Sequence, residues 1–316
     1  MMLRNGLEHL KAGSTRISSR EERDRHSRRF APVCLVLIST VSYLLAAFLL
    51  RYGLSAVFAR LFELWGIGPD NAYLAPGWAR CLYDWHGNIV SALTALALLL
   101  FSAFLRRIWK INDYHIQPDW SWAYRSGLIG LGCSALAVCL SLIPDSMRLE
   151  WPLTAPGWDY SVAFAAIIIL LRILSEEVFL KRVLFDGLIE YWGTAAVVVT
   201  CSLAFLLLRV NEVAGVVGWF NLFLTGALTC LLYSSFGFAA VICFRTGWEI
   251  GYLLVWGSNS GGNCSLYRMY AVSENLMTGG DYGLINGLWA TIVLSGCLIW
   301  LAWRHANPSR NHKCSI

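Results

Sequence analysis

Eight apolar runs of roughly helical length leave this chain few ways to fold. An apolar stretch of about 20 residues is long enough to cross the hydrocarbon core of a membrane as a helix. Residues 194–208 and 248–257 form shorter runs, so we expect them as tilted or buried helices inside a bundle. The eight runs are 31–50, 87–105, 126–143, 160–180, 194–208, 216–244, 248–257 and 284–303.

The composition excludes an ordinary soluble domain, because 57% of the 316 residues are hydrophobic, 14% are charged and the mean hydropathy is +0.55. We therefore predict an all-α fold, a polytopic membrane helix bundle of about eight transmembrane helices, with the lipid bilayer as its first partner. The net charge of +5 lies mainly near the ends of the chain. It indicates membrane orientation and no nucleic-acid partner.

Basic residues predict how the bundle is oriented, because cytosolic segments of membrane proteins carry an excess of Lys and Arg. Residues 1–29 contain eight basic and four acidic residues, and we expect them to form a flexible cytosolic arm. The segment after the second run and the tail, 304–316, are also basic. With eight spans, both termini are then cytosolic and the run that begins at Tyr160 enters from the outer face.

A pair of adjacent carboxylates, Glu176 and Glu177, marks the central run. The uncharged part that precedes Arg172 is about 18 Å long as a helix, shorter than the ~30 Å hydrocarbon core. The helix must therefore carry its charges into the membrane, where ionisable groups usually form a functional site. The structural alternative is that two ion pairs at helical spacing, Arg172–Glu176 and Glu177–Lys181, neutralise these charges.

Polar residues elsewhere in the apolar runs have simpler interpretations. Asn221, Thr225 and Thr229 recur along one face of the sixth run, which favours hydrogen bonds between helices, with the lining of a cavity as the alternative. Glu249 follows an Arg-Thr-Gly sequence, and we interpret it as a charge at the membrane interface.

The ten cysteines do not predict a metal site, because seven of them lie singly inside apolar runs without a CxxC spacing. We interpret these seven as small buried hydrophobic residues. Cys81 and Cys264 fall in two loops that we place on the same side of the membrane, where one disulfide is possible. The seven are Cys34, Cys133, Cys139, Cys201, Cys230, Cys243 and Cys297.

The second half of the chain contains the sequence SEEVFLKRVLFDGL, in which Glu176 and Glu177 are followed by Lys181 and Arg182. This sequence resembles the first motif of the CPBP family of intramembrane proteases, the CAAX-type and bacteriocin-processing enzymes of the Abi domain, with Lys181 at the family's Arg position and Arg182 at its Gly position. RTGWEIGYLLVWGSN supplies a later Arg-Thr-Gly turn and ends in Asn259. NLMTGGDYGLINGLWATIVL resembles the last loop and helix, with Asn286 where many members have Glu.

The resemblance divides the chain into four parts: a basic arm, 1–29, the N-terminal transmembrane helices and loops, 30–159, a CPBP-like core, 160–303, and a tail, 304–316. The family's two histidines are absent from the core. Arg209 stands at the first of these positions, four residues after Phe205, and Val255 stands at the second. There is no histidine at all between Asp159 and Arg304.

The resemblance implies an endopeptidase of a bacterial inner membrane that hydrolyses membrane or lipidated proteins, with weak activity. Glu176 would activate water and Glu177 would orient it or relay the proton, while Arg209 and Asn259 would stabilise the oxyanion. Some members are discussed as zinc enzymes; without the histidines we expect neither a metal nor another cofactor here. The alternative is an inactive pseudoprotease that binds a membrane protein or a lipidated peptide in the same cavity.

Overall fold

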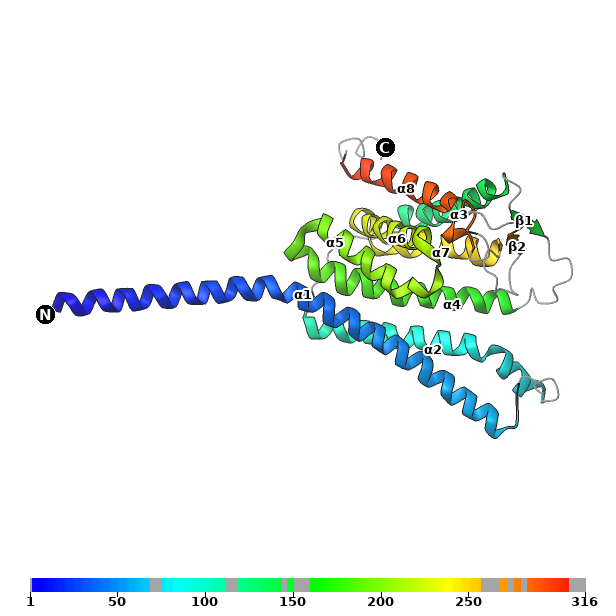
Figure 1. Ribbon diagram of the computed structural model, residues 1–316, viewed down its shortest axis with the longest axis horizontal. Coiled ribbons are helices and arrows are strands. Elements are labelled where there is room, and N and C mark those ends of the chain that lie inside the picture. Colours follow the sequence, from blue (N-terminus) through cyan, green and yellow to red (C-terminus); the bar gives the residue numbers. More distant parts are fainter. Residues whose placement is uncertain are drawn as a thin grey trace.

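The structure is a computed structural model, and it describes residues 2–68, 76–111, 119–143, 147–150, 160–256, 268–271, 276–279 and 283–306. These residues form a helical bundle with one small sheet (Figure 1). The long helices are α1 (Met2–Leu64), α2 (Gly77–Trp109), α3 (Trp120–Leu142), α4 (Tyr160–Glu177), α5 (Asp186–Arg209), α6 (Gly215–Phe236), α7 (Phe238–Glu249) and α8 (Leu288–Ala306).

Five helices in the described part of the chain are long and apolar enough to cross a membrane. They are Pro32–Leu64, Trp85–Trp109, Trp120–Leu142, Gly215–Phe236 and Phe238–Val255, and Leu288–Arg304 forms a shorter apolar helix. This confirms the predicted all-α, membrane-type bundle. It does not confirm the predicted number of eight spans.

The first helix includes both residues 2–29 of the predicted basic arm and the first predicted apolar run, 31–50. α1 is continuous over 63 residues, and its N-terminal part projects from the bundle as a helix (Figure 1). The flexible, cytosolic character of the arm stays a prediction. The apolar part also continues past Arg51 to Leu64, beyond the end of the predicted run 31–50.

Two glycines interrupt the helices, and one of them, Gly237, places a boundary that the apolar runs do not reveal. Gly237 has φ 82° and ψ −177°, and it separates α6 from α7 inside the predicted run 216–244. Gly193 has φ 72° and ψ 168° and breaks α5. Both conformations are essentially restricted to glycine. The prediction of separate runs at 216–244 and 248–257 is therefore wrong, because α7 continues directly into a π-helix, Ile250–Val255.

Small residues bring α7 against α3. A Cβ atom on Gly130 would collide with the carbonyl oxygen of Phe244, and one on Gly247 would collide with the carbonyl oxygen of Gly127. Close backbone approach through small residues is common between membrane helices. It fixes the helix that carries Arg245 against the bundle.

A short antiparallel sheet lies at one end of the bundle and was not predicted. Strand β1 (Met147–Glu150) pairs with β2 (Arg268–Ala271), with Met147 opposite Ala271 and Glu150 opposite Arg268. The pairing ties the segment after α3 to the segment before α8. Most of the loops between the predicted apolar runs lie outside the described residues.

Candidate functional site

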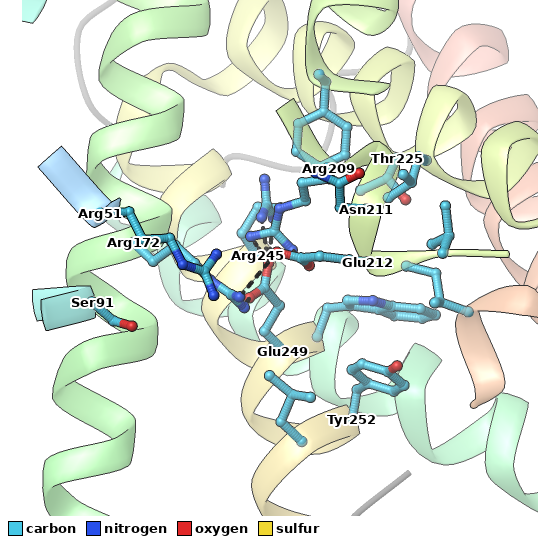
Figure 2. Close-up of a pocket in the computed structure, with 16 residues that line it drawn as sticks. Arg51, Ser91, Arg172, Arg209, Asn211, Glu212, Thr225, Arg245, Glu249 and Tyr252 are labelled. Carbon is cyan, nitrogen blue, oxygen red and sulfur yellow. Dashed lines mark hydrogen bonds and ion pairs between the residues drawn. The ribbon is translucent and has the colours of Figure 1, made fainter. Parts of the chain in front are cut away.

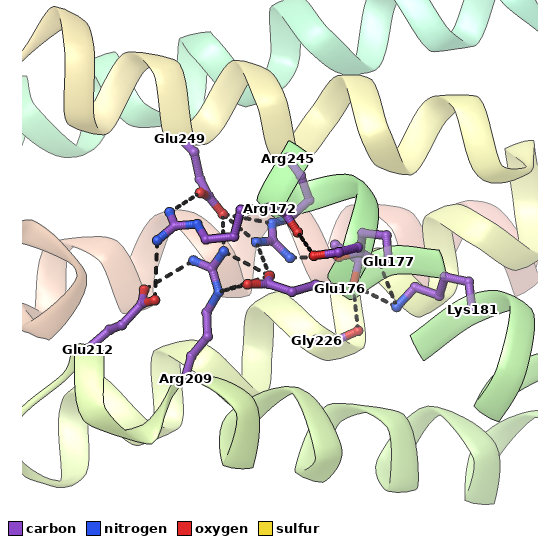
Figure 3. Close-up of polar contacts among 11 residues, drawn as sticks. Arg172, Glu176, Glu177, Lys181, Arg209, Glu212, Gly226, Arg245 and Glu249 are labelled. Atoms are coloured by element: carbon purple, nitrogen blue, oxygen red, sulfur yellow. Dashed lines mark hydrogen bonds and ion pairs between the residues drawn. The ribbon is translucent and has the colours of Figure 1, made fainter. Parts of the chain in front are cut away.

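Glu176 lies at the centre of a buried cluster of charges. Its Oε2 atom accepts hydrogen bonds from Nε of Arg209 at 3.0 Å and from Nη2 of Arg245 at 3.1 Å, and Nη2 of Arg209 lies 2.8 Å away (Figure 3). Its Oε1 atom accepts a further bond from Nε of Arg209 at 3.1 Å. Two arginines from α5 and α7 therefore surround one carboxylate of α4.

Glu177 shares Arg245 with Glu176 and also pairs with Lys181. Nη1 of Arg245 donates to its Oε1 at 2.6 Å, and Nζ of Lys181 lies 3.3 Å from its Oε2. Lys181 is fully buried and also donates to Thr229 Oγ1 at 3.0 Å and contacts Cys230 Sγ at 3.3 Å. The predicted ion pair Glu177–Lys181 is confirmed.

Glu249 is a member of the cluster, and its interpretation as an interfacial charge is wrong. It is only 3% exposed, and its Oε1 atom pairs with Arg245 and lies 2.9 Å from Nη2 of Arg209. Its Oε2 accepts from Nη2 of Arg172 at 2.7 Å. Arg172 thus reaches across to α7, and the predicted Arg172–Glu176 pair does not form.

A fourth carboxylate closes the cluster from the turn between α5 and α6. Glu212 lies 3.3 Å from both Arg172 and Arg209. The turn itself is fixed by Asn286, whose Oδ1 accepts from the backbone N–H of Ala214 at 2.7 Å. Four cations and four carboxylates make up this cluster: Arg172, Lys181, Arg209, Arg245, Glu176, Glu177, Glu212 and Glu249. Six of these side chains are buried, whereas those of Arg172 and Glu212 are 34% and 44% exposed. The burial of the six requires such mutual neutralisation.

The local backbone contributes to this arrangement. A π-helix, Val178–Phe185, begins directly after Glu177, and the π-helix of Ile250–Val255 begins directly after Glu249. π-Helical turns are rare and occur often at functional sites. The ring of Phe205 lies near both arginines, with its centroid 5.6 Å from Cζ of Arg209 and 4.7 Å from Cζ of Arg245. Such cation–π contacts help to hold two like charges side by side.

A cavity of about 540 Å³ opens beside the cluster, between α1, α2 and the helices of the core (Figure 2). Four arginines line it, and two carboxylates, Glu212 and Glu249, lie among them. Glu176 and Glu177 do not line it. The arginines therefore separate the two predicted catalytic glutamates from the cavity. The four are Arg51, Arg172, Arg209 and Arg245.

The remaining predicted positions have mixed outcomes. Arg209 joins Glu176 as expected, whereas Asn259 lies outside the described residues. Asn221 donates from Nδ2 to the carbonyl oxygens of Ile285 and Gly287 at 2.7 and 3.0 Å, so its predicted role between helices is confirmed. Thr225 bonds within α6 and also lines the cavity.

The cysteines are only partly the buried residues that we predicted. Cys133, Cys201 and Cys230 are buried, whereas Cys34 and Cys139 are exposed on the outside of the bundle. The proposed pairing of Cys81 with Cys264 falls outside the described side chains. Within the described part of the chain, no group of three or more His, Cys, Asp or Glu side chains is placed to hold a metal ion. The expectation of no cofactor stays a prediction.

Four residues of the cluster were not predicted as site residues from the sequence: Arg172, Glu212, Arg245 and Glu249. Arg245 and Glu249 are four residues apart in an apolar helix, and such a pair is itself a signal of a buried charge site. Glu212 had no comparable signal, because it lies in a turn.

Comparisons with protein-family models, with curated proteins and with solved structures found no match to this chain. Functional conclusions therefore depend on the residues themselves.

Proposed function

We propose that this chain is an integral protein of a bacterial inner membrane, with eight spans, cytosolic termini and a fold similar to that of CPBP proteases. In this proposal it is a pseudoprotease. It binds the carboxylate of a membrane protein or lipidated peptide in the arginine-lined cavity and does not cleave it.

The position of the glutamates behind the arginines is the observation that carries this proposal. A general base must reach the water that it activates. Glu177 is fully buried, and both oxygens of Glu176 already accept hydrogen bonds from guanidinium groups. A carboxylate offers about four acceptor positions. Little capacity remains to hold a water beside a peptide bond in the cavity.

The charge of the cavity supports an anionic ligand. Arg51 lines the cavity from α1, and no ion pair engages it in the described part of the chain. With Arg51 the cluster holds five cations and four carboxylates, one positive charge in excess. Arg51 lies about 28 Å along α1 from Pro32 and about 20 Å from Leu64, in the middle of an apolar helix. An ionisable residue at such a place favours a functional role.

The other cavity walls favour a partly apolar ligand. Leu222, Trp248, Tyr252, Leu253 and Ile285 line the same space as the arginines. A lipidated peptide that ends in a carboxylate offers both an apolar part for these walls and an anion for the arginines. This combination supports a peptide over a small inorganic anion.

Slow endopeptidase activity is the second candidate function. It is favoured by the meeting of Glu176, Arg209 and Arg245 from three helices, with 10% of the Glu176 side chain exposed. Arg209 stays protonated and is unable to act as a base, but it can stabilise an oxyanion. If the scaffold retains a protease geometry, the double variant Arg209→His, Val255→His gains activity that the parent lacks.

Binding of defined peptides tests the proposal. Fluorescent prenylated peptides with a free C-terminal carboxylate or a C-terminal amide are titrated into the full chain in detergent, and anisotropy is measured. We expect the parent to prefer the carboxylate and Arg51→Gln to bind it roughly tenfold to a hundredfold more weakly, the range for a hydrogen bond to a charged group. Arg51→Lys keeps the charge and should retain most of the preference.

Arg60→Gln is the matched control, because Arg60 lies on the same helix but its side chain is 78% exposed and pairs with Glu63. Its affinity should equal that of the parent. Equal affinity of the parent for carboxylate and amide would overturn the proposal.

A further inference from the structure

A second cavity, of about 840 Å³, opens at the basic end of the bundle. It lies between the C-terminal end of α2, the π-helix after Glu177 and the start of α7. α2 ends where the N-terminal part of α1 leaves the bundle (Figure 1). Four cations line this cavity, and none of its described lining residues is a carboxylate. The cations are Arg106, Arg107, Lys110 and Arg182.

The cations are presented on apolar walls. Cζ of Arg182 lies 5.1 Å from the ring centroid of Phe238, which also lines the cavity, and Asp186 lies 3.8 Å from its guanidinium. Arg182 is thus held in place, while Arg107 and Lys110 are exposed to the cavity and solvent. Val178 adds to the apolar wall.

Lys110 has an unusual backbone that fixes its position at the rim. It caps α2 with φ 50° and ψ 42°, and it is the one non-glycine residue with positive φ in the described part of the chain. This left-handed conformation is uncommon for a lysine. It ends α2, with the N–H of Ile111 donating to the carbonyl oxygen of Arg106 at 3.2 Å, and so places Lys110 where the helix meets the cavity.

The outer surface of α2 beside the cavity is strongly apolar. Leu100, Phe104 and Ile108 are 68%, 57% and 56% exposed, and their four-residue spacing places them in one stripe along the helix. A ligand that bridges the cations and this stripe must have an anionic head and apolar chains. A basic pocket at the end of membrane helices, next to such a surface, matches an anionic phospholipid.

We propose that this cavity binds the phosphate headgroup of an anionic phospholipid, with Arg107 and Lys110 as its exposed phosphate contacts and the acyl chains along the Leu100, Phe104 and Ile108 stripe. The same cations set the orientation of the bundle by the positive-inside rule. The site is separate from the arginine-lined cavity and does not depend on the function proposed for it.

Native mass spectrometry of the full chain tests this site. Purified protein is titrated with phosphatidylglycerol, with phosphatidylcholine and with inorganic phosphate, and bound adducts are counted. We expect the parent to retain phosphatidylglycerol in preference to phosphatidylcholine. The variant Arg107→Gln, Lys110→Gln should bind phosphatidylglycerol roughly thirtyfold more weakly, since it loses the contribution of two basic residues near the bilayer surface to the binding free energy.

The matched control is Arg28→Gln, Arg29→Gln, which removes the same charge from the N-terminal arm. It should bind phosphatidylglycerol like the parent. Equal losses in both double variants would overturn the site, because they would indicate general charge attraction. Adducts with inorganic phosphate but no preference for phosphatidylglycerol would overturn the lipid as its ligand. Thermal unfolding of each variant, which we expect to match the parent, establishes that the pocket variant is folded.

Discussion

Arg209 contacts one carboxylate oxygen of Glu176, Oε2, with both its Nε atom, at 3.0 Å, and its Nη2 atom, at 2.8 Å. The two residues are 33 positions apart in the sequence and come from different helices. The resemblance implies a histidine at position 209 that would assist the catalytic glutamate. This chain has Arg209 there, a permanent cation whose contacts occupy the carboxylate of Glu176. The pair is buried, with side chains 6% and 10% exposed.

Loss of the negative charge of Glu176 should destabilise the bundle. Glu176→Gln leaves Arg209 and Arg245 with one carboxylate fewer, and removal of one member of a buried ion pair typically costs about 3–5 kcal/mol. We expect a clear drop in thermal unfolding temperature in detergent. Glu63→Gln, which loses only the exposed contact to Arg60, should change stability by less than about 1 kcal/mol. A Glu176→Gln variant as stable as the Glu63→Gln control would contradict the buried pair.

The coupling between Glu177 and Lys181 should be measurable by a double-mutant cycle. Lys181→Met leaves Glu177 with a buried charge that only Arg245 balances, whereas Glu177→Gln, Lys181→Met removes both members. We expect the double variant to be more stable than the sum of the two single losses by roughly 0.5–3 kcal/mol. Strict additivity of the unfolding free energies would show that the two side chains are not coupled.

The sequence could predict that charges are buried, and one pair within a helix, but not the pairs that form between helices. Glu176 and Glu177 are recognisable because they interrupt an apolar run, and Glu177–Lys181 because its spacing is helical. The contact of Arg172 with Glu249 joins residues 77 positions apart. It depends on how α4 lies against α7, which no local pattern encodes.

The fold shows the same limit. Apolar runs predict a membrane-type helical bundle, because a helix of about 20 apolar residues has the length that crosses the hydrocarbon core of a membrane. They do not reveal the end of α6, because Gly237 is a single residue in a continuous apolar segment. Nor do they predict the pairing of β1 with β2, two four-residue strands that are distant in sequence.

The contact between α3 and α8 can be tested with the native cysteines. Sγ of Cys133 lies 3.2 Å from Sγ of Cys297, and both thiols are at least partly buried. Treatment with diamide, which takes up the two hydrogens of the thiols, should join them in a disulfide. We expect peptide mapping to find the Cys133–Cys297 crosslink in the parent. Cys139, which is exposed on α3, serves as the comparison, and preferential crosslinking of Cys139 to Cys297 would be inconsistent with this packing.

Membrane orientation gives a further prediction. Because basic residues are in excess at both ends of the chain, we expect both termini on the cytosolic side. Fusions of a cytosol-active fluorescent reporter and of a periplasm-active phosphatase at each terminus measure this directly. Fluorescence should appear at both ends. Phosphatase activity from one terminus alone would rule out an even number of spans.

The central claim is that Glu176 and Glu177 balance arginines and do not activate water. Its most direct test is the cleavage of prenylated and transmembrane peptides by the purified parent, with products measured by mass spectrometry beside a Glu176→Ala variant. General-base assistance contributes roughly 10²–10⁴ in rate, so its presence would be unmistakable. We predict that parent and variant give the same background level of product. Turnover by the parent that is lost in Glu176→Ala would contradict the account.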